Sequence, residues 1–299
     1  MEPHWDDMRV FLAVARTDSL SGAGRVLKID PATVGRRIAR LEEAMGTPLF
    51  AKSPQGYAPT DAGQRLIAHA EHAEQAMELA REEVAGTSGQ LSGQIRIGAP
   101  DGCANFLLPQ VCARISDENP DLDIQIVSLP RVFNLSRREA DMAIGVSQPA
   151  AGRLSVQKIT DYKLSLVASN RYMRQHESIE SLDDLKNHKI VGYIPDMIFD
   201  KELDYLSEIG VEHVDLASNS VPVQMAWIRQ GAGIGIVHDF ALAPISRRVS
   251  RLLADQVHLT RSFYLIRHVD DRRLERLNRF AEALVREIRA EVTELEANA

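Results

Sequence analysis

The sequence predicts an α/β fold class in which a helical N-terminal part precedes a larger part of alternating strands and helices. Three observations support this prediction. Apolar residues recur every three or four positions before residue 86, as they do on amphipathic helices. A short linker, Gly86-Thr-Ser-Gly89, then interrupts this period. After the linker, short β-rich runs alternate with helical segments, which is typical of α/β domains.

Length and charge restrict the organisation further. The chain has 299 residues, 44% of them hydrophobic, and two or three domains are expected at this length. Its net charge of -7 excludes a protein that binds nucleic acid over its whole surface. Residues 1–60 carry eight basic and seven acidic side chains, a net +1, which leaves -8 for the remainder. Any contact with nucleic acid is therefore expected to be local and N-terminal.

Residues 1–60 predict three helices followed by a small hairpin. Residues 8–15 form the first helix, and Ser21 is expected to cap a second, short helix that ends at residue 27. Asp30 caps the third helix, which Gly46 ends. Its apolar side carries Val34, Ile38, Leu41 and Met45. Two helices joined by a short turn predict a helix-turn-helix, and residues 47–60 predict its wing.

The side of the third helix opposite its apolar residues is basic and predicts a DNA-contact surface. Arginine pairs with guanine edges or clamps phosphates, and the sequence leaves both roles open. The alternative is a solvated helix face, which the helix-turn-helix context disfavours. The predicted DNA-binding residues are Pro31, Ala32, Thr33, Arg36, Arg37, Arg40 and, in the wing, Lys52.

Residues 61–88 predict a long linker helix with an apolar stripe. Its apolar positions are spaced by alternating steps of four and three residues, which is the a/d pattern of a coiled coil. Two interpretations remain: the stripe packs on its own domain, or it pairs with a second chain, which is favoured because the short N-terminal part offers little to cover it. The stripe consists of Leu66, Ala70, Ala73, Met77, Ala80 and Val84.

Residues 89–299 predict a larger domain of two α/β lobes with largely parallel sheets. The span is long for one small sheet, so lobe I is placed at about residues 90–161 and 267–299 and lobe II at about 162–266. A final helix is expected over residues 270–294. The expected strands lie at residues 94–98, 123–127, 142–145, 164–168, 189–192 and 233–237.

The order of these parts resembles that of the LysR-type transcriptional regulators, over nearly the whole chain. The N-terminal residues at the family's spacings are Phe11-Leu-Ala-Val-Ala15, Ser19-Leu, Ala23, Ile38, Leu41-Glu42, Gly46-Thr-Pro-Leu-Phe50 and Pro59-Thr-Asp-Ala-Gly63. The C-terminal residues are Gln94-Ile-Arg-Ile-Gly98, Ala140-Asp-Met-Ala-Ile-Gly145 and Gln230-Gly-Ala-Gly-Ile-Gly235. The resemblance implies a winged helix-turn-helix, a linker helix and a periplasmic-binding-protein-like effector domain.

The resemblance also implies function and partners. Members bind double-stranded promoter DNA as dimers, here through the linker helix, or as tetramers, and a small-molecule effector alters recruitment of RNA polymerase. One departure concerns the third helix. Where members usually read Ser-Gln-Pro-Ala, this chain has Asp30, Pro31, Ala32 and Thr33, so the glutamine that most often reads bases is replaced by Pro31. The sequence of the DNA half-site is therefore not inherited from the family.

The effector site is expected between the two lobes, at strand ends and helix N-termini. An acidic Asp101 facing the ligand would favour a cationic or hydroxyl-bearing group, whereas Arg131 would favour the reverse, and both alternatives stay open. Cys103 is interpreted as a small buried thiol rather than a redox sensor. The predicted effector residues are Asp101, Gly102, Cys103, Arg131, Val146, Ser147, Tyr193, Ser218 and Asn219.

Other functions receive little support from the sequence. No GxSxG, HExxH or P-loop pattern occurs, and no cofactor or metal is expected. The glycines of residues 231–235 follow a helical segment instead of a strand, the inverse of a dinucleotide motif. The chain lacks an apolar leader or span, so a cytoplasmic protein without a membrane partner is expected. The competing class is a solute-binding module whose N-terminal helices serve only assembly.

Overall fold

The computed structural model describes residues 2–53, 56–85, 91–128, 140–150 and 152–299. The chain divides into two compact units, one within residues 1–88 and one within residues 89–299. Arg131 and the linker residues 86–90 lie outside the described residues. No helix among those described is both long enough and apolar enough to cross a membrane.

The first unit is a helical bundle with a small hairpin. Its apolar core includes Phe11, Val34, Ile38 and Leu41, so the predicted apolar side of the third helix is confirmed. The N-cap of the second helix lies two residues earlier than expected, at Ser19 instead of Ser21, and the Ser19 hydroxyl accepts from the amide of Gly22. The elements are α1 (Trp5–Thr17), α2 (Leu20–Leu27), α3 (Pro31–Met45), β1 (Phe50–Ser53), β2 (Gly56–Pro59) and α4 (Asp61–Ala85).

The hairpin packs against the bundle through aromatic rings. Strands β1 and β2 are antiparallel, which confirms the predicted wing, and Phe50 pairs with Pro59. The ring of Phe50 lies 5.1 Å from that of Phe11 and 6.0 Å from that of Tyr57. The Tyr57 amide also donates to the carbonyl of Asp18 at 2.9 Å. The wing is therefore fixed to the end of α1.

The apolar stripe of α4 divides into two halves with different surroundings. Ala70 is fully buried and Leu66 packs against the core of the first unit, as the intrachain interpretation predicts. A bidentate bond from Arg16 to Glu74, at 2.7 and 3.1 Å, also holds α4 to α1. Farther along, Met77 is 50% exposed and Val84 is 89% exposed. The second half of the stripe is thus left open to solvent.

The second unit contains one mixed nine-stranded sheet, ordered β4-β3-β5-β11-β6-β9-β7-β8, with β10 paired to β6. Pairing is parallel at both ends, among β3, β4 and β5 and among β7, β8 and β9. The strands at the centre are antiparallel, so the prediction of largely parallel sheets holds only toward the ends. The strands are β3 (Gly93–Ala99), β4 (Leu122–Ser128), β5 (Met142–Gly145), β6 (Leu154–Ser169), β7 (Ile190–Gly192), β8 (Leu216–Ala217), β9 (Ile234–His238), β10 (Val249–Arg251) and β11 (Leu259–His268).

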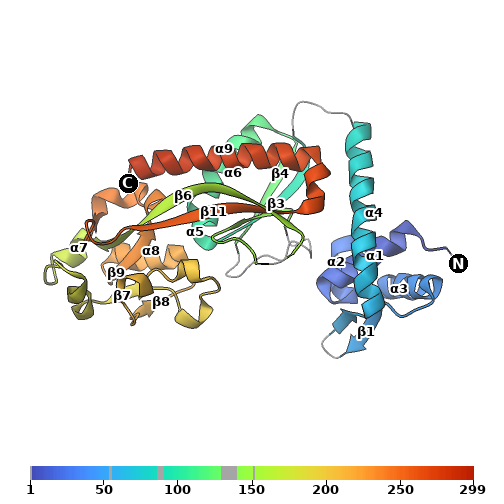
Figure 1. Ribbon diagram of the computed structural model, residues 1–299, viewed down its shortest axis with the longest axis horizontal. Helices are drawn as coiled ribbons and strands as arrows, with labels where there is room; N and C mark the ends of the chain where they lie inside the picture. The colour runs from blue at the N-terminus through green and yellow to red at the C-terminus, as the bar shows by residue number, and fades with distance from the viewer. Residues whose placement is uncertain (1, 54–55, 86–90, 129–139, 151) are drawn as a thin grey trace. The chain divides into compact units, whose positions relative to one another are not determined.

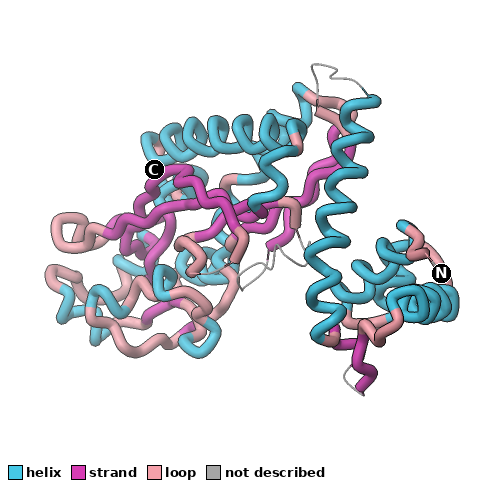
Figure 2. The backbone as a smooth tube through the Cα atoms, turned by 45° about the vertical axis from the view of Figure 1, so that its right-hand side comes forward, coloured by secondary structure: helices cyan, strands magenta, loops and turns pink. Residues whose placement is uncertain are grey.

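The long antiparallel pair β6 and β11 joins the two parallel ends, which are lobe I around β3 and lobe II around β7 (Figure 1). Helix α9 runs along these strands beside α6, and in Figure 2 it is the long cyan helix that leads to the C-terminus. Arg114 of α6 bonds Glu287 at 3.0 Å and Glu291 at 2.7 Å, which fixes the two helices together. The helices are α5 (Asp101–Phe106), α6 (Leu108–Glu118), α7 (Asn170–Met173), α8 (Val221–Gln230) and α9 (Glu275–Ala297).

Candidate functional site

Helix α3 presents its N-terminal turn and one side to solvent. Asp30 accepts a hydrogen bond from the amide of Ala32 at 2.8 Å, and Pro31 occupies the first turn, where no amide donor is needed. Pro31 and Ala32 are exposed and Thr33 is partly exposed. Positively polarised amides at this end of the helix suit contact with phosphate.

Arg36 is the freest of the three arginines on α3. Its guanidinium donates to the Thr33 hydroxyl at 2.9 Å, and both side chains lie at the surface. In the part of the chain that the structure describes, no carboxylate forms an ion pair with Arg36. Its full positive charge is therefore available to an anion from outside the chain.

Arg37 and Arg40 are turned toward α1. Arg37 lies 3.5 Å from Asp6, and both side chains remain partly solvated. Arg40 binds Asp7 at both carboxylate oxygens, at 2.6 and 2.5 Å, and the Asp7 side chain is only 1% exposed. The hydrogen bond to Asp7 raises the pKa of Arg40 above its ordinary value. Arg40 therefore orients α3 on α1, and its contact with DNA stays a prediction.

Lys52 lies in β1 opposite Tyr57, at the wing. Its side chain is outside the described part of the structure, and its role as a phosphate contact stays a prediction.

In the second unit, Asp101 joins the two lobes. It begins α5 of lobe I, and its Oδ2 accepts from the amide of Val221, the first residue of α8 in lobe II, at 2.6 Å. Its Oδ1 accepts from Asn105 at 2.9 Å and from the Ser128 hydroxyl at 3.1 Å. Both oxygens are thus engaged, and the negative charge of Asp101 occupies the positive end of α8.

Gly102 and Cys103 are buried behind Asp101. A Cβ atom on Gly102 would lie 2.7 Å from the ring of His238, so only glycine allows this approach of α5 to β9. Burial raises the pKa of Cys112 to about 12 and that of the fully buried Cys103 well above its ordinary value. The two thiols are therefore protonated at neutral pH and poorly reactive.

A second lobe contact involves Ser147, which follows β5. Its hydroxyl donates to the carboxylate of Asp200 in lobe II, and Val146 beside it is buried. Ser218 organises the turn before α8, because its hydroxyl accepts from the Ser220 amide and its carbonyl accepts from Gln224. Asn219 is half-buried in the same turn. Most of the predicted effector residues are therefore already hydrogen-bonded to other residues or buried.

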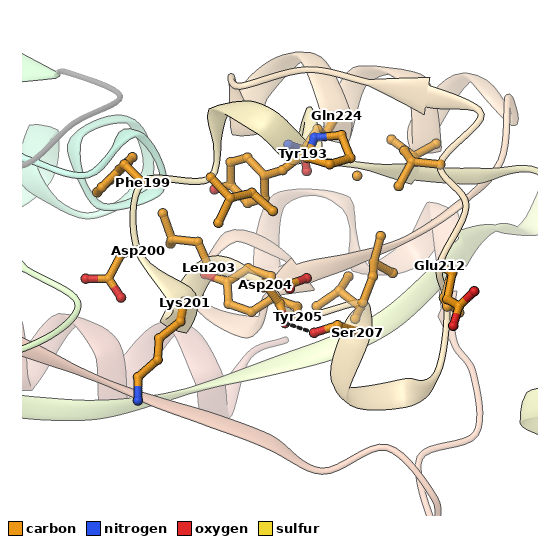
Figure 3. A pocket seen from close by; sticks show the side chains of 18 of the residues that line it. Tyr193, Phe199, Asp200, Lys201, Leu203, Asp204, Tyr205, Ser207, Glu212 and Gln224 are labelled. Atoms are coloured by element: carbon orange, nitrogen blue, oxygen red, sulfur yellow. Dashed lines mark hydrogen bonds between the residues drawn. The ribbon is translucent and has the colours of Figure 1, made fainter.

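A cavity in the second unit lies beside these contacts, inside lobe II. Its volume is about 690 Å³. Tyr193 and Gln224 line its interior, whereas Lys201 and Glu212 extend away at its margins (Figure 3). Of the predicted effector residues that the structure describes, only Tyr193 contributes to its wall.

Sequence reasoning missed several residues around this region. Asp200 and Gln224 each contact a predicted residue, and His238 packs against the rings of Tyr162 and Phe240. Asp200 stands in a segment without periodicity and gives no signal in sequence. His238 ends the apolar run that begins at residue 234, and a histidine at a buried strand end was the one available signal.

Comparison with known proteins places these two units in a family. Residues 5–64 match the model described as bacterial regulatory helix-turn-helix protein, lysR family. Residues 88–289, more than half of the chain, match the LysR substrate binding domain.

The chain belongs to the LysR family. It is therefore a DNA-binding transcriptional regulator with an effector-binding domain. It is 25% identical over 262 residues to the transcriptional activator TtdR of Escherichia coli, covering 83% of this chain and 82% of TtdR. It is 23% identical to the regulator CrgA of Neisseria meningitidis, and that match spans 64% of each chain.

Solved structures agree with the fold of this LysR-family chain. A full-length OxyR variant from Pseudomonas aeruginosa has a TM-score of 0.72 at 14% identity, covering 96% of this chain and 98% of that one. The family is one of transcriptional regulators rather than enzymes. Within the described residues, no group of three or more histidine, cysteine or acidic side chains could hold a metal ion.

Proposed function

We propose that this regulator binds promoter DNA by inserting α3 into the major groove, with Arg36 as its leading contact. The observation that supports this most directly is the exposed guanidinium of Arg36 beside the open N-terminal turn of α3, which forms no ion pair with any carboxylate that the structure describes. Thr33, Ala32 and Pro31 are the neighbouring contacts, and Arg37 adds positive charge. Arg40 acts chiefly by orienting α3 through Asp7.

The regulator acts as a homodimer through α4, in a cytoplasmic setting. Exposed apolar side chains at Met77 and Val84 support pairing with a second copy. Two paired helix-turn-helix units would read a partly palindromic site, because two-fold protein symmetry is mirrored in the DNA. The resemblance to the family extends this to a tetramer, with RNA polymerase as a further partner.

The effector acts on the contact between lobes I and II. Asp101 and Ser147 each bond a residue of the opposite lobe, so a ligand that competes for either bond would change how the lobes meet. The N-terminus of α8 already holds the carboxylate of Asp101, so an anionic ligand gains little there. A cationic or hydroxyl-bearing effector is the class that the described residues favour.

The test is a nuclease footprint on the DNA upstream of the protein's own gene, repeated with a panel of metabolites. A protected, partly palindromic region whose extent changes with one metabolite is expected. Absence of protection there and at neighbouring promoters would overturn the proposal. Deleting residues 1–88 distinguishes this proposal from a solute-binding module whose N-terminal helices serve only assembly. A regulator would lose DNA binding and keep ligand binding. A solute-binding module would show no DNA binding even before the deletion.

A further inference from the structure

The cavity of about 690 Å³ is lined wholly by residues of lobe II (Figure 3). It lies between strands β7 and β9 and the connection from β7 to β8. No lobe I residue that the structure describes contributes to its wall. The cavity lies inside lobe II, and it borders the contact between the lobes only at Asp200, the partner of Ser147. Its size lies within the usual range for small-molecule sites.

The connection from β7 to β8 explains why space remains here. Parallel neighbouring strands are usually joined by an α-helix that covers the sheet. This connection instead contains three single-turn 3-10 helices, η3 (Pro195–Met197), η4 (Lys201–Leu203) and η5 (Ser207–Ile209). Gly192 leaves part of the floor without a side chain, and a Cβ there would lie 2.6 Å from Leu206. Because the short 3-10 turns cover less area than a helix and Gly192 has no side chain, this face of the sheet is incompletely covered.

The wall is largely apolar, with two polar atoms that lack a hydrogen-bond partner among the described residues, the Tyr205 hydroxyl and the side-chain oxygen of Gln224. Gln224 is only 5% exposed, and its Nε2 donates to the Ser218 carbonyl at 2.6 Å. Its Oε1 accepts no hydrogen bond from the residues that the structure describes. A buried amide oxygen is stabilised by a donor, so this position favours a ligand that supplies one. The apolar lining residues are Val191, Ile198, Phe199, Leu203, Leu206, Val211, Val214 and Ile236.

Charge restricts the ligand further. Among the lining residues, the carboxylates of Asp200, Asp204 and Glu212 outnumber the ammonium group of Lys201. An anion entering this cavity would lose hydration without gaining an adequate positive partner. A ligand without negative charge is therefore favoured.

We propose that this cavity is a second small-molecule site, which binds an uncharged, largely apolar compound whose O–H or N–H donates to Gln224 Oε1. The site lies inside lobe II, beside the effector contacts between the lobes, and its occupancy does not depend on DNA binding. A bound ligand would nevertheless affect them, because the covering segment bonds Ser147 through Asp200 and holds Arg261 of β11 through Glu202.

The proposal is tested by titrating the full-length protein with two neutral probes of similar shape. 2-Naphthol carries an O–H donor and 2-methoxynaphthalene does not. Saturable 1:1 binding is expected for both, with 2-naphthol bound about three- to tenfold more tightly, as one net hydrogen bond provides. In Gln224→Met this difference should disappear. Naphthalene-2-carboxylate, with the same ring system and a negative charge, should bind much more weakly than either.

A cavity-filling variant tests whether the two neutral probes bind inside the lobe II cavity. Val214→Phe places a larger side chain in the cavity and should weaken both neutral probes at least tenfold. The matched control is Val223→Phe, because Val223 is 40% exposed on α8 and does not line the cavity. Circular dichroism and the melting temperature establish that both variants fold. Absence of saturable binding to the wild-type protein, or equal binding to a folded Val214→Phe variant, would overturn the proposal. Either result leaves the DNA-binding proposal untouched.

Discussion

Arg36 carries the prediction that tests the DNA surface most directly. Its side chain is exposed and, among the described residues, forms one hydrogen bond, to Thr33, so Arg36→Ala should leave folding unchanged. Loss of one guanine or phosphate contact should weaken DNA binding by about 1–3 kcal/mol, roughly 5- to 150-fold. The measurement is a binding titration at physiological salt, with Arg229→Ala in lobe II as a control that removes the same charge. Unchanged affinity for Arg36→Ala would remove Arg36 from the interface.

His238 makes the stability of the second unit depend on pH. The ring is buried between aromatic side chains, and this burial lowers its pKa to about 4. The unfolded chain has a histidine pKa of about 6.5, so between these values it binds more protons than the folded protein. Stability is therefore full above about pH 6.5 and falls by about 3 kcal/mol as the pH drops to 4.

The variant His238→Phe keeps an aromatic ring and removes the titration. Urea denaturation of both proteins at pH 7 and pH 4.5 should show a smaller loss of stability in the variant. Equal losses in the two proteins would show that other groups govern the acid sensitivity.

Residue roles could be predicted only where they depend on local sequence. The exposed side of α3 follows from helical periodicity, so Arg36 was correctly placed on a surface. The pairing of Arg40 with Asp7 joins residues 33 positions apart and depends on how α1 crosses α3. The engagement of Asp101 by Val221 spans 120 positions. Such contacts arise from tertiary packing, which spacing along a sequence does not encode.

At the scale of elements, the start of α4 depends on a close approach. Gly63 lies in its first turn, and a Cβ there would lie 2.1 Å from the carbonyl oxygen of Leu49. Gly63→Ala should destabilise the first unit by about 1–3 kcal/mol, because the helix must shift away from the wing. Thermal unfolding measures the effect, and Gln64→Ala, an exposed neighbour on the same helix, is the control. Equal melting temperatures for the wild type and Gly63→Ala would mean that the backbone accommodates the added Cβ atom without loss of stability.

Elements with a clear period were predictable, and those without one were not. The strands at residues 94–98 and 233–237 were recognisable as β-rich runs, and both are present. The 16-residue strand β6 was predicted only in its apolar C-terminal part, since its first half alternates with polar residues as it crosses between lobes. The 3-10 turns over the lobe II cavity have no periodic signal, so the cavity was missed.

For the molecule as a whole, Asp101 is expected to couple the lobes. Asp101→Ala removes the acceptor of the Val221 amide and leaves the N-terminus of α8 uncompensated. Hydrogen exchange at Val221 should become at least tenfold faster, because the amide loses its partner. Asn105→Ala is the control, since it removes one donor to Asp101 while the bond to Val221 remains. Equal exchange rates in wild type and Asp101→Ala would show that α8 is held by other contacts.

The proposed homodimer places its contact on the second half of α4, where Met77 and Val84 are exposed while Ala70 is buried against the first unit. The double variant Met77→Glu and Val84→Glu places charges on the open stripe and should give a monomer in sedimentation velocity. DNA affinity should then fall by about a hundredfold or more, because two linked half-site contacts become one. Gln64→Glu with Ala68→Glu adds the same charge to exposed positions off the stripe and should stay dimeric. If the double variant also stays dimeric, another surface pairs the chains, and the open half of α4 needs a different partner.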